Sequence, residues 1–246
     1  MAQRGLQLAM WVRGSGLDYS IGNLALAAVV FLATHFLLSH PWRAALVRAL
    51  GERMFLMVYS LVALGALSWL IVAFDAAPDG PMLWDGFAVV PWIIASILTL
   101  ISMALLFGSL SGNPALPQAQ VAGLSARKPD GVFRITRHPM MFGIAIWAVS
   151  HIIVAPNLRS LIVSATMLIL ALVGSHLQDR KKIRLHDREW RAYVKRTHFW
   201  PRLNRLDLLG WNWGFGLLGW LGMTWIHMAS AGIPAGIWKW IVVNEY

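Results

Sequence analysis

Long stretches without charged residues recur along this chain and restrict what it can fold into. Five windows of about 20 residues contain no Asp, Glu, Lys or Arg, namely 20–38, 54–74, 87–110, 139–158 and 160–177. A helix needs about 20 apolar residues to cross the hydrocarbon core of a bilayer. Only helices and closed barrels satisfy their backbone polar groups there. The windows therefore predict an all-α, polytopic transmembrane helical bundle with five spans.

A sixth uncharged window, 211–238, is rich in glycine and contains Pro234. We predict a sixth membrane segment here, and its form as one span or a re-entrant segment stays open. The predicted organisation has three parts: an N-terminal segment, 1–19; a transmembrane domain, 20–202, with an amphipathic part at 178–202; and a C-terminal extension, 203–246.

The positive charge is sorted between alternate loops. The loops 39–53, 111–138 and 178–212 together hold 17 of the 21 Lys and Arg residues, whereas loop 75–86 holds three aspartates and no base. The positive-inside rule then predicts cytoplasmic basic loops and an external N-terminus. This sorting explains the net charge of +10 without a nucleic-acid partner. We expect a bacterial inner-membrane protein whose partner is the lipid bilayer, and the oligomeric state stays open.

The segment 181–196 is strongly basic, yet it can form an amphipathic helix. Its apolar residues Ile183, Trp190, Tyr193 and Val194 share one face at helical spacing. We expect this face to lie on anionic lipid. Cysteine is absent from the chain, which excludes disulfides, iron–sulfur clusters and thiolate ligands to haem.

Two histidines, His35 and His151, lie inside predicted spans, and His138 lies in an Arg137-His138-Pro139 step at the start of the fourth. Ionisable side chains at membrane depth are costly and indicate function. A neutral imidazole there can ligate haem iron, pass protons, or hydrogen-bond to a neighbouring helix. Arg137 can fork onto a carboxylate, such as Asp179 or a ligand carboxylate, or extend to lipid phosphate.

Four segments together resemble the NnrU family of integral membrane proteins. They are Ala33-Thr34-His35-Phe36, Gly51-Glu52-Arg53 with Tyr59-Ser60, 131–140 with Gly143, Trp147 and His151, and Asp179-Arg180. The similarity covers roughly residues 22–202. It extends to the zeta-carotene isomerases, which are membrane haem b enzymes.

The isomerase resemblance implies haem b held by His35 and His151. It also implies redox or isomerase-like chemistry on an apolar, lipid-like molecule. A cysteine that precedes the second ligand by three residues in the isomerases is replaced by Ala148. Both imidazoles must reach one depth to share an iron; otherwise His138 or His176 becomes the partner of His35.

A second resemblance, to the isoprenylcysteine carboxyl methyltransferases, implies S-adenosylmethionine as an alternative cofactor. The positions that match its binders are Arg137, His138 and Tyr193. The chain departs from that pattern at Met141, where the family has tyrosine, and at Gln178-Asp179, where it has paired glutamates. A third interpretation is a non-catalytic protein of membrane assembly or transport.

Overall fold

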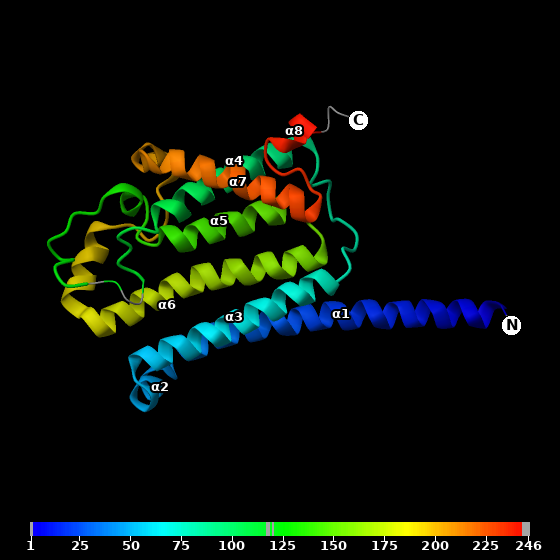
Figure 1. The fold of residues 1–246 in the computed structure, drawn as a ribbon, viewed down its shortest axis with the longest axis horizontal. Coiled ribbons are helices and arrows are strands. Elements are labelled where there is room, and N and C mark those ends of the chain that lie inside the picture. Colours follow the sequence, from blue (N-terminus) through cyan, green and yellow to red (C-terminus); the bar gives the residue numbers. More distant parts are fainter. Residues whose placement is uncertain (1, 117–118, 120, 243–246) are drawn as a thin grey trace. The chain divides into compact units, whose positions relative to one another are not determined.

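The computed structural model describes residues 2–116, 119 and 121–242, with side chains from residue 20 onward (Figure 1). The described part is helical and contains no strand. Its elements are α1 (Ala2–Ser39), α2 (Arg43–Leu50), α3 (Glu52–Ala76), α4 (Val89–Gly108), η1 (Gly131–Arg134), α5 (Pro139–Val154), α6 (Leu158–Arg196), η2 (Leu203–Leu209), α7 (Asn212–Ala231) and α8 (Trp238–Val242).

Within the described residues, four helices are long and apolar enough to cross a membrane: Ser20–Ser39 of α1, then α3, α4 and α6. α5 is a shorter apolar helix of 16 residues. The chain is thus a multi-pass membrane protein, and the all-α bundle predicted from its sequence is confirmed. The fourth predicted window ends earlier than expected, at Val154, because Pro156 disfavours helix at the residue before it. Asn157 then caps α6 by accepting the backbone N–H of Ser160 at 3.0 Å.

The structure divides into two compact units. Unit 1 comprises Met1–Trp84 and Ala155–Thr166. In it α1 and α2 both pack on α3, and Leu24, Ala27 and Phe31 of α1 are buried. The short helix α2 is joined to α3 by an ion pair between Arg43 and Glu52 at 2.6 Å.

Unit 2 comprises Asp85–Val154 and Met167–Tyr246. Its central helix is α4, which contacts both α5 and α7. Two glycines permit these contacts. A Cβ on Gly143 of α5 would lie 3.0 Å from the Ser102 carbonyl oxygen, and one on Gly216 of α7 would lie 2.6 Å from the Cα of Ala104. Ser102 also donates a hydrogen bond to the Gly143 carbonyl at 2.7 Å.

The sixth predicted membrane segment consists of two helices. α7 ends at Ala231, the next residue, Gly232, adopts a left-handed conformation with φ +67°, and α8 follows after Pro234. The Trp238 indole donates to the Thr224 hydroxyl at 3.1 Å, which ties α8 to α7. Glycine and proline together therefore end the long helix, so the window is not one continuous helix.

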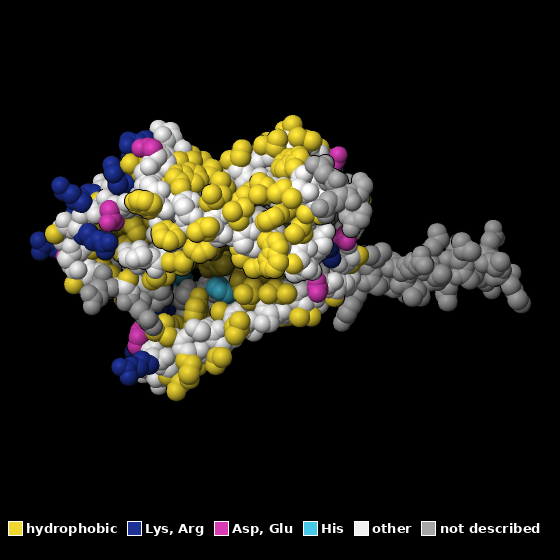
Figure 2. All heavy atoms as spheres, turned by 45° about the horizontal axis from the view of Figure 1, so that its top comes forward, with side chains coloured by type: hydrophobic (Ala, Val, Ile, Leu, Met, Phe, Trp, Pro, Cys, Tyr) yellow, Lys and Arg dark blue, Asp and Glu magenta, His cyan; other side chains and the backbone are white. Residues whose placement is uncertain are grey.

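The charged part of α6 begins after Leu177 and changes direction within the helix. His186 has non-helical angles, φ −140° and ψ 41°, and Figure 1 shows α6 turning near this point. Lys and Arg side chains gather at this end of unit 2, whereas hydrophobic side chains dominate the surface over its helices (Figure 2). We call residues 178–196 the α6 extension and place them outside the membrane-spanning part of α6.

Candidate functional site

One buried carboxylate, Asp179, lies at the centre of a polar network in unit 2. Arg137 donates to its Oδ2 twice, from Nε at 2.8 Å and from Nη2 at 2.6 Å. Arg137 is 9% exposed and Asp179 is 7% exposed. The fork onto Asp179 that the sequence suggested is therefore formed within the protein.

The second oxygen of Asp179 has two further partners. His138 Nε2 lies 2.9 Å from Oδ1, and the Trp190 indole donates to the same oxygen at 3.1 Å. A carboxylate only accepts hydrogen bonds, so the Nε2 of His138 carries the hydrogen. In the neutral ring the lone pair then lies on Nδ1, which is buried and has no hydrogen-bond partner among the described residues.

The chain near residue 200 holds this network in place. Pro139 starts α5, where the missing N–H costs nothing, and the preceding residues pair with the stretch after α6. The Arg137 backbone N–H donates to the His198 carbonyl at 2.8 Å, and the Thr136 hydroxyl donates to the Phe199 carbonyl at 2.6 Å. The Phe199 ring lies 5.1 Å from the Arg137 guanidinium carbon. These contacts fix the direction in which Arg137 and His138 enter the site.

Burial alone would raise the pKa of Asp179, because it disfavours the charged carboxylate. The hydrogen bonds and charges of His138 and Arg137 outweigh burial and hold the pKa below its ordinary value. Asp179 is therefore an ionised acceptor that is saturated by four N–H groups. It can orient His138, but its bonds leave it poorly suited to accept a proton.

Trp190 is a member of this network that the sequence did not reveal. It is fully buried, although it lies eleven residues after Asp179 on the same helix. A straight helix would separate the two by about 16 Å along its axis. The change of direction at His186 brings the indole back to the carboxylate, and no local pattern indicated this bend.

The apolar face of the α6 extension covers protein, which corrects the prediction that it lies on lipid. Trp190 and Tyr193 pack with Ala115, Val121 and Leu124 of the loop that follows α4. The shared face was predicted correctly, but its partner was not. A loop distant in sequence can cover an amphipathic face as well as a membrane surface can.

Four hydrogen bonds fasten this loop to the extension. They join Gln178 to the Ala115 carbonyl at 2.8 Å, Lys182 to the Leu116 carbonyl at 2.9 Å, the Ser125 N–H to Glu189 at 2.6 Å, and Arg196 to the Leu124 carbonyl at 2.8 Å. Under the loop, the Tyr193 hydroxyl is buried and has no partner within the described part of the chain. Burial raises the pKa of Tyr193 above its ordinary value.

His151 lies near the far end of α5, in a different environment. Its Nδ1 lies 2.9 Å from the Trp147 carbonyl oxygen, and its ring packs on the Trp147 ring with centroids 4.2 Å apart. The carbonyl only accepts, so the hydrogen is on Nδ1 and Nε2 retains its lone pair. Ala148, which replaces the cysteine of the isomerases, is fully buried.

His35 has a closely similar environment in unit 1. Its Nδ1 lies 2.7 Å from the Phe31 carbonyl oxygen, and its ring lies 4.3 Å from the Phe31 ring. Because His35 and His151 belong to different units, their pairing stays a prediction. The alternative partners are less suited to a ligand role, since His138 is bonded to Asp179 and His176 is exposed on α6.

No group of three or more His, Cys, Asp or Glu residues that could hold a metal ion occurs among the described residues. A metal site built from the protein alone is therefore not indicated there. Haem iron needs only axial ligands from the protein, because the macrocycle supplies the others. The single imidazoles of His35 and His151 fit that requirement.

Comparisons with known proteins fit the observed membrane fold. The NnrU protein family matches residues 23–235. The chain is 25% identical over 185 residues to 15-cis-zeta-carotene isomerase, chloroplastic, of Arabidopsis thaliana, covering 71% of this chain and 49% of the relative. It is 28% identical over 194 residues to methanethiol S-methyltransferase of Pseudomonas deceptionensis, covering 70% and 71%. The chain thus spans about half the length of the isomerase. No solved structure matches it.

Proposed function

The chain belongs to the NnrU family, and from this premise we propose that it binds haem b in the membrane through His35 and His151. The isomerase similarity supports this choice. Bound haem b would supply an iron centre for redox or isomerase-like chemistry on an apolar substrate. The chain would position that centre and exclude water from it.

The matching state of the two rings is the observation that carries the proposal. Each histidine donates its Nδ1 hydrogen to the carbonyl four residues earlier, and each ring packs on the aromatic side chain of that same residue. Such bonds fix the ring orientation and direct the Nε2 lone pair outward, as an iron ligand requires. A single histidine in this arrangement could serve only to hydrogen-bond within its helix. Two histidines with the same arrangement favour a shared role as iron ligands.

In this proposal the Asp179 network positions α5, the helix that carries His151, and does not itself bind the iron. Arg137 and His138 stand immediately before α5, and Asp179 anchors both to α6. The network therefore fixes where α5 begins and how it is rotated. His151 lies on the same helix, so its direction depends on that anchor.

Absorption spectroscopy of the full chain, purified after haem-replete expression, tests the proposal. We expect a Soret band that His35→Ala and His151→Ala each weaken strongly, because alanine cannot replace an axial imidazole. His176→Ala, an exposed position on α6, is the matched control and should leave the band unchanged. A colourless protein, or a band that neither His35→Ala nor His151→Ala alters, would refute haem ligation by these residues.

S-adenosylmethionine-dependent methyl transfer is the second candidate function. Two buried polar atoms favour it, the Nδ1 of His138 and the hydroxyl of Tyr193, because neither has a partner in the described part of the chain. The similarity to a methyltransferase supports it as well. A bound molecule could hydrogen-bond to both atoms. Calorimetry with S-adenosylmethionine decides between the two cofactors: saturable binding by a colourless protein supports methyl transfer. Binding of neither cofactor would favour the non-catalytic alternative of assembly or transport.

We also propose an inner-membrane location with the N-terminus outside and the basic loops in the cytoplasm. The sorting of 17 of the 21 Lys and Arg residues to alternate loops supports this orientation. Reporter fusions at Asp79 and Arg188 should report opposite compartments. The same compartment for both fusions would contradict it.

A further inference from the structure

The short helix α2 lies between two membrane spans. Ser20–Ser39 of α1 precedes it and α3 follows it, and both are long and apolar enough to cross a bilayer. Only residues 40–42 join the first span to α2, and only Gly51 joins α2 to the second. Gly51 has a φ of +77°, which favours glycine and lets the chain turn within one residue. Because both of its ends are fixed to spans, α2 has to lie at the membrane surface.

The described part of the chain leaves an apolar stripe on α2 uncovered. None of the residues of α2 is buried, although the helix contacts α3. Trp42, which stands just before the helix, is 53% exposed, and Leu50 at its end is 43% exposed. Together with Leu46 they recur at every fourth position, so they lie on one face of the helix. At the membrane surface, lipid acyl chains can cover this face.

The rest of the segment is positively charged. Between residues 39 and 53 the chain has three arginines and one acid, namely Arg43, Arg48, Arg53 and Glu52. Glu52 is paired with Arg43 at 2.6 Å. Arg48 and Arg53 are exposed, and neither makes an ion pair with any described residue. Two positive charges therefore have no counter-charge within the described residues.

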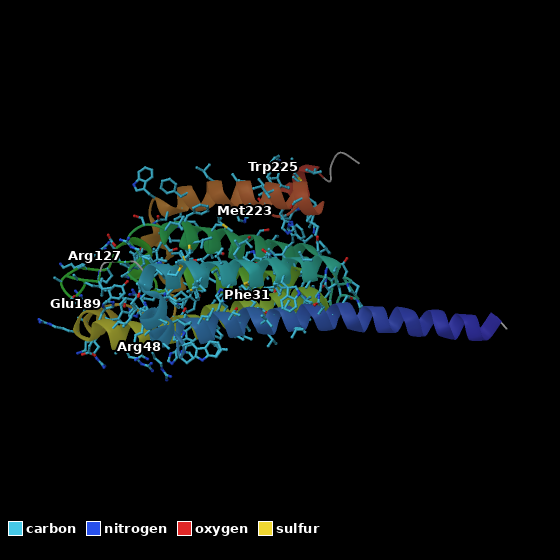
Figure 3. All side chains as sticks on the ribbon, turned by 60° about the horizontal axis from the view of Figure 1, so that its bottom comes forward. Phe31, Arg48, Arg127, Glu189, Met223 and Trp225 are labelled. Carbon is cyan, nitrogen blue, oxygen red and sulfur yellow. The ribbon has the colours of Figure 1, made fainter. Side chains whose placement is uncertain are left out.

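Arg48 lies on the side of α2 opposite the apolar stripe. It follows Leu46 by two residues, which corresponds to about 200° around a helix. Figure 3 shows Arg48 at the end of unit 1 that α2 forms, away from Phe31 of α1. An apolar face with basic residues on the other side is typical of helices that lie in the plane of the membrane interface. A long arginine side chain there can extend to the lipid phosphates.

We propose that α2 docks on the anionic head-group layer of the bilayer, with Arg48 and Arg53 bound to lipid phosphates and the Trp42–Leu46–Leu50 stripe in the acyl layer. Exposed arginines are common, but the two adjoining spans hold this pair at the bilayer surface. A guanidinium can donate several hydrogen bonds to a phosphate, and basic segments beside a span are attracted to anionic lipid. A zwitterionic surface would cover the stripe equally well but would supply no net counter-charge. The proposal rests on neither haem nor S-adenosylmethionine.

The docked helix would also fix the depth of the helix pair that carries His35. Arg43 of α2 is ion-paired with Glu52 of α3, and its guanidinium carbon lies 5.5 Å from the Phe55 ring. The Phe55 ring lies 6.1 Å from the Tyr59 ring, which in turn lies 6.0 Å from the His35 ring. A continuous set of contacts therefore joins the proposed lipid-binding helix to His35.

Lipid quenching of a fluorophore on the full chain tests the proposal. The chain has no cysteine, so Leu50→Cys carries a single label. The labelled protein is placed in nanodiscs that contain phosphatidylglycerol or phosphatidylcholine brominated on the acyl chains, and quenching gives the relative association of each lipid with α2. We expect phosphatidylglycerol to be preferred by about 25-fold, because each arginine near an anionic surface contributes about five-fold. A label at Leu64→Cys, which is 60% exposed in the middle of α3, is the matched control and should show no preference.

Arginine variants identify the head-group contacts. In the Leu50→Cys background, Arg48→Gln and Arg53→Gln should each lower the preference by about five-fold. Arg188→Gln, which removes an exposed arginine of the α6 extension, is the matched control and should leave the preference unchanged. All three side chains are exposed, so these substitutions leave the packing of the helices intact. Added salt should reduce the preference of the unsubstituted protein, because it screens exposed charges.

Three results would overturn the proposal. Equal quenching by the two lipids would mean that α2 is held by its apolar stripe alone. A preference that survives both arginine substitutions would place the anionic lipid elsewhere. Absence of quenching by either lipid would mean that protein, such as a second copy of the chain, covers α2. A loss of haem in His35→Ala would leave the lipid preference unchanged, so this proposal and the haem proposal fail independently.

Discussion

His138 and His151 lie at the two ends of α5 in opposite chemical states. His138 precedes the first residue of the helix and points its Nε2 at Asp179, so the buried Nδ1 is left over. His151 lies three residues before the end, and its Nδ1 is taken by a backbone carbonyl, so Nε2 is left over. The two histidines at the ends of this helix therefore leave different ring nitrogens available, Nδ1 in His138 and Nε2 in His151.

The difference shows that the partner of a histidine determines its role. His138 belongs to an ion-pair network, and its first contribution is to hold α5 against α6. Among the described residues, the hydrogen-bond partners of His151 are Trp147 and Ser150, which lie in its own helix turn. These bonds orient the ring and join it to no other element.

Asp179→Ala should have the largest effect. It leaves the guanidinium of Arg137 buried without a counter-charge, and breaking a buried ion pair in this way costs about 3–5 kcal/mol. The measurement is the free energy of unfolding in mixed detergent micelles. The control is Asp187→Ala, whose exposed ion pair with Arg191 contributes less than about 1 kcal/mol. Equal losses in the two variants would mean that the network does not hold the helices together.

In the haem-free protein, His138→Ala should lower the unfolding free energy more than His151→Ala does, by a smaller amount than the effect of Asp179→Ala. Removing His138 takes a hydrogen bond from a charged acceptor, worth about 1.5–3 kcal/mol. Removing His151 takes one local bond, worth about 1 kcal/mol, from a half-buried ring. Unfolding of both variants in the same micelles checks the order. A larger loss in His151→Ala would reverse the roles assigned here.

The third and smallest expected effect is the pH dependence of the unfolding free energy, which should be absent near neutral pH. The pKa of Asp179 is lower in the folded protein than in the unfolded chain, so its contribution is complete above the ordinary aspartate pKa of about 3.9. It is lost as the pH falls through the folded-state pKa. The difference in unfolding free energy between wild type and Asp179→Asn should therefore stay constant from pH 7 to pH 5 and shrink in stronger acid. Shrinkage already at pH 6 would contradict the low pKa.

Much of the architecture could be predicted from local sequence. The uncharged windows gave the membrane helices, because apolar length decides whether a segment can span a bilayer. The ends of α5 at Val154 and of α7 at Ala231 were not predicted, although Pro156 and Gly232 stand just after them in the sequence. Arg137 and Asp179 were recognised as site residues, but lipid phosphate and ligand carboxylates remained open as partners for Arg137.

The sequence by itself therefore determined that this protein lies in a membrane, that it is all-α, which loops are basic and which histidines are candidate ligands. Each of these features depends on residues close together in the chain. Tertiary structure alone decided that Trp190 reaches Asp179 and that the α4–η1 loop covers the amphipathic face of the extension. It also decided that His138 Nδ1 has no partner among the residues that the structure describes. The first depends on the bend at His186, and all three depend on contacts between distant segments. Helical periodicity specifies which residues share a face but carries no information about what that face meets.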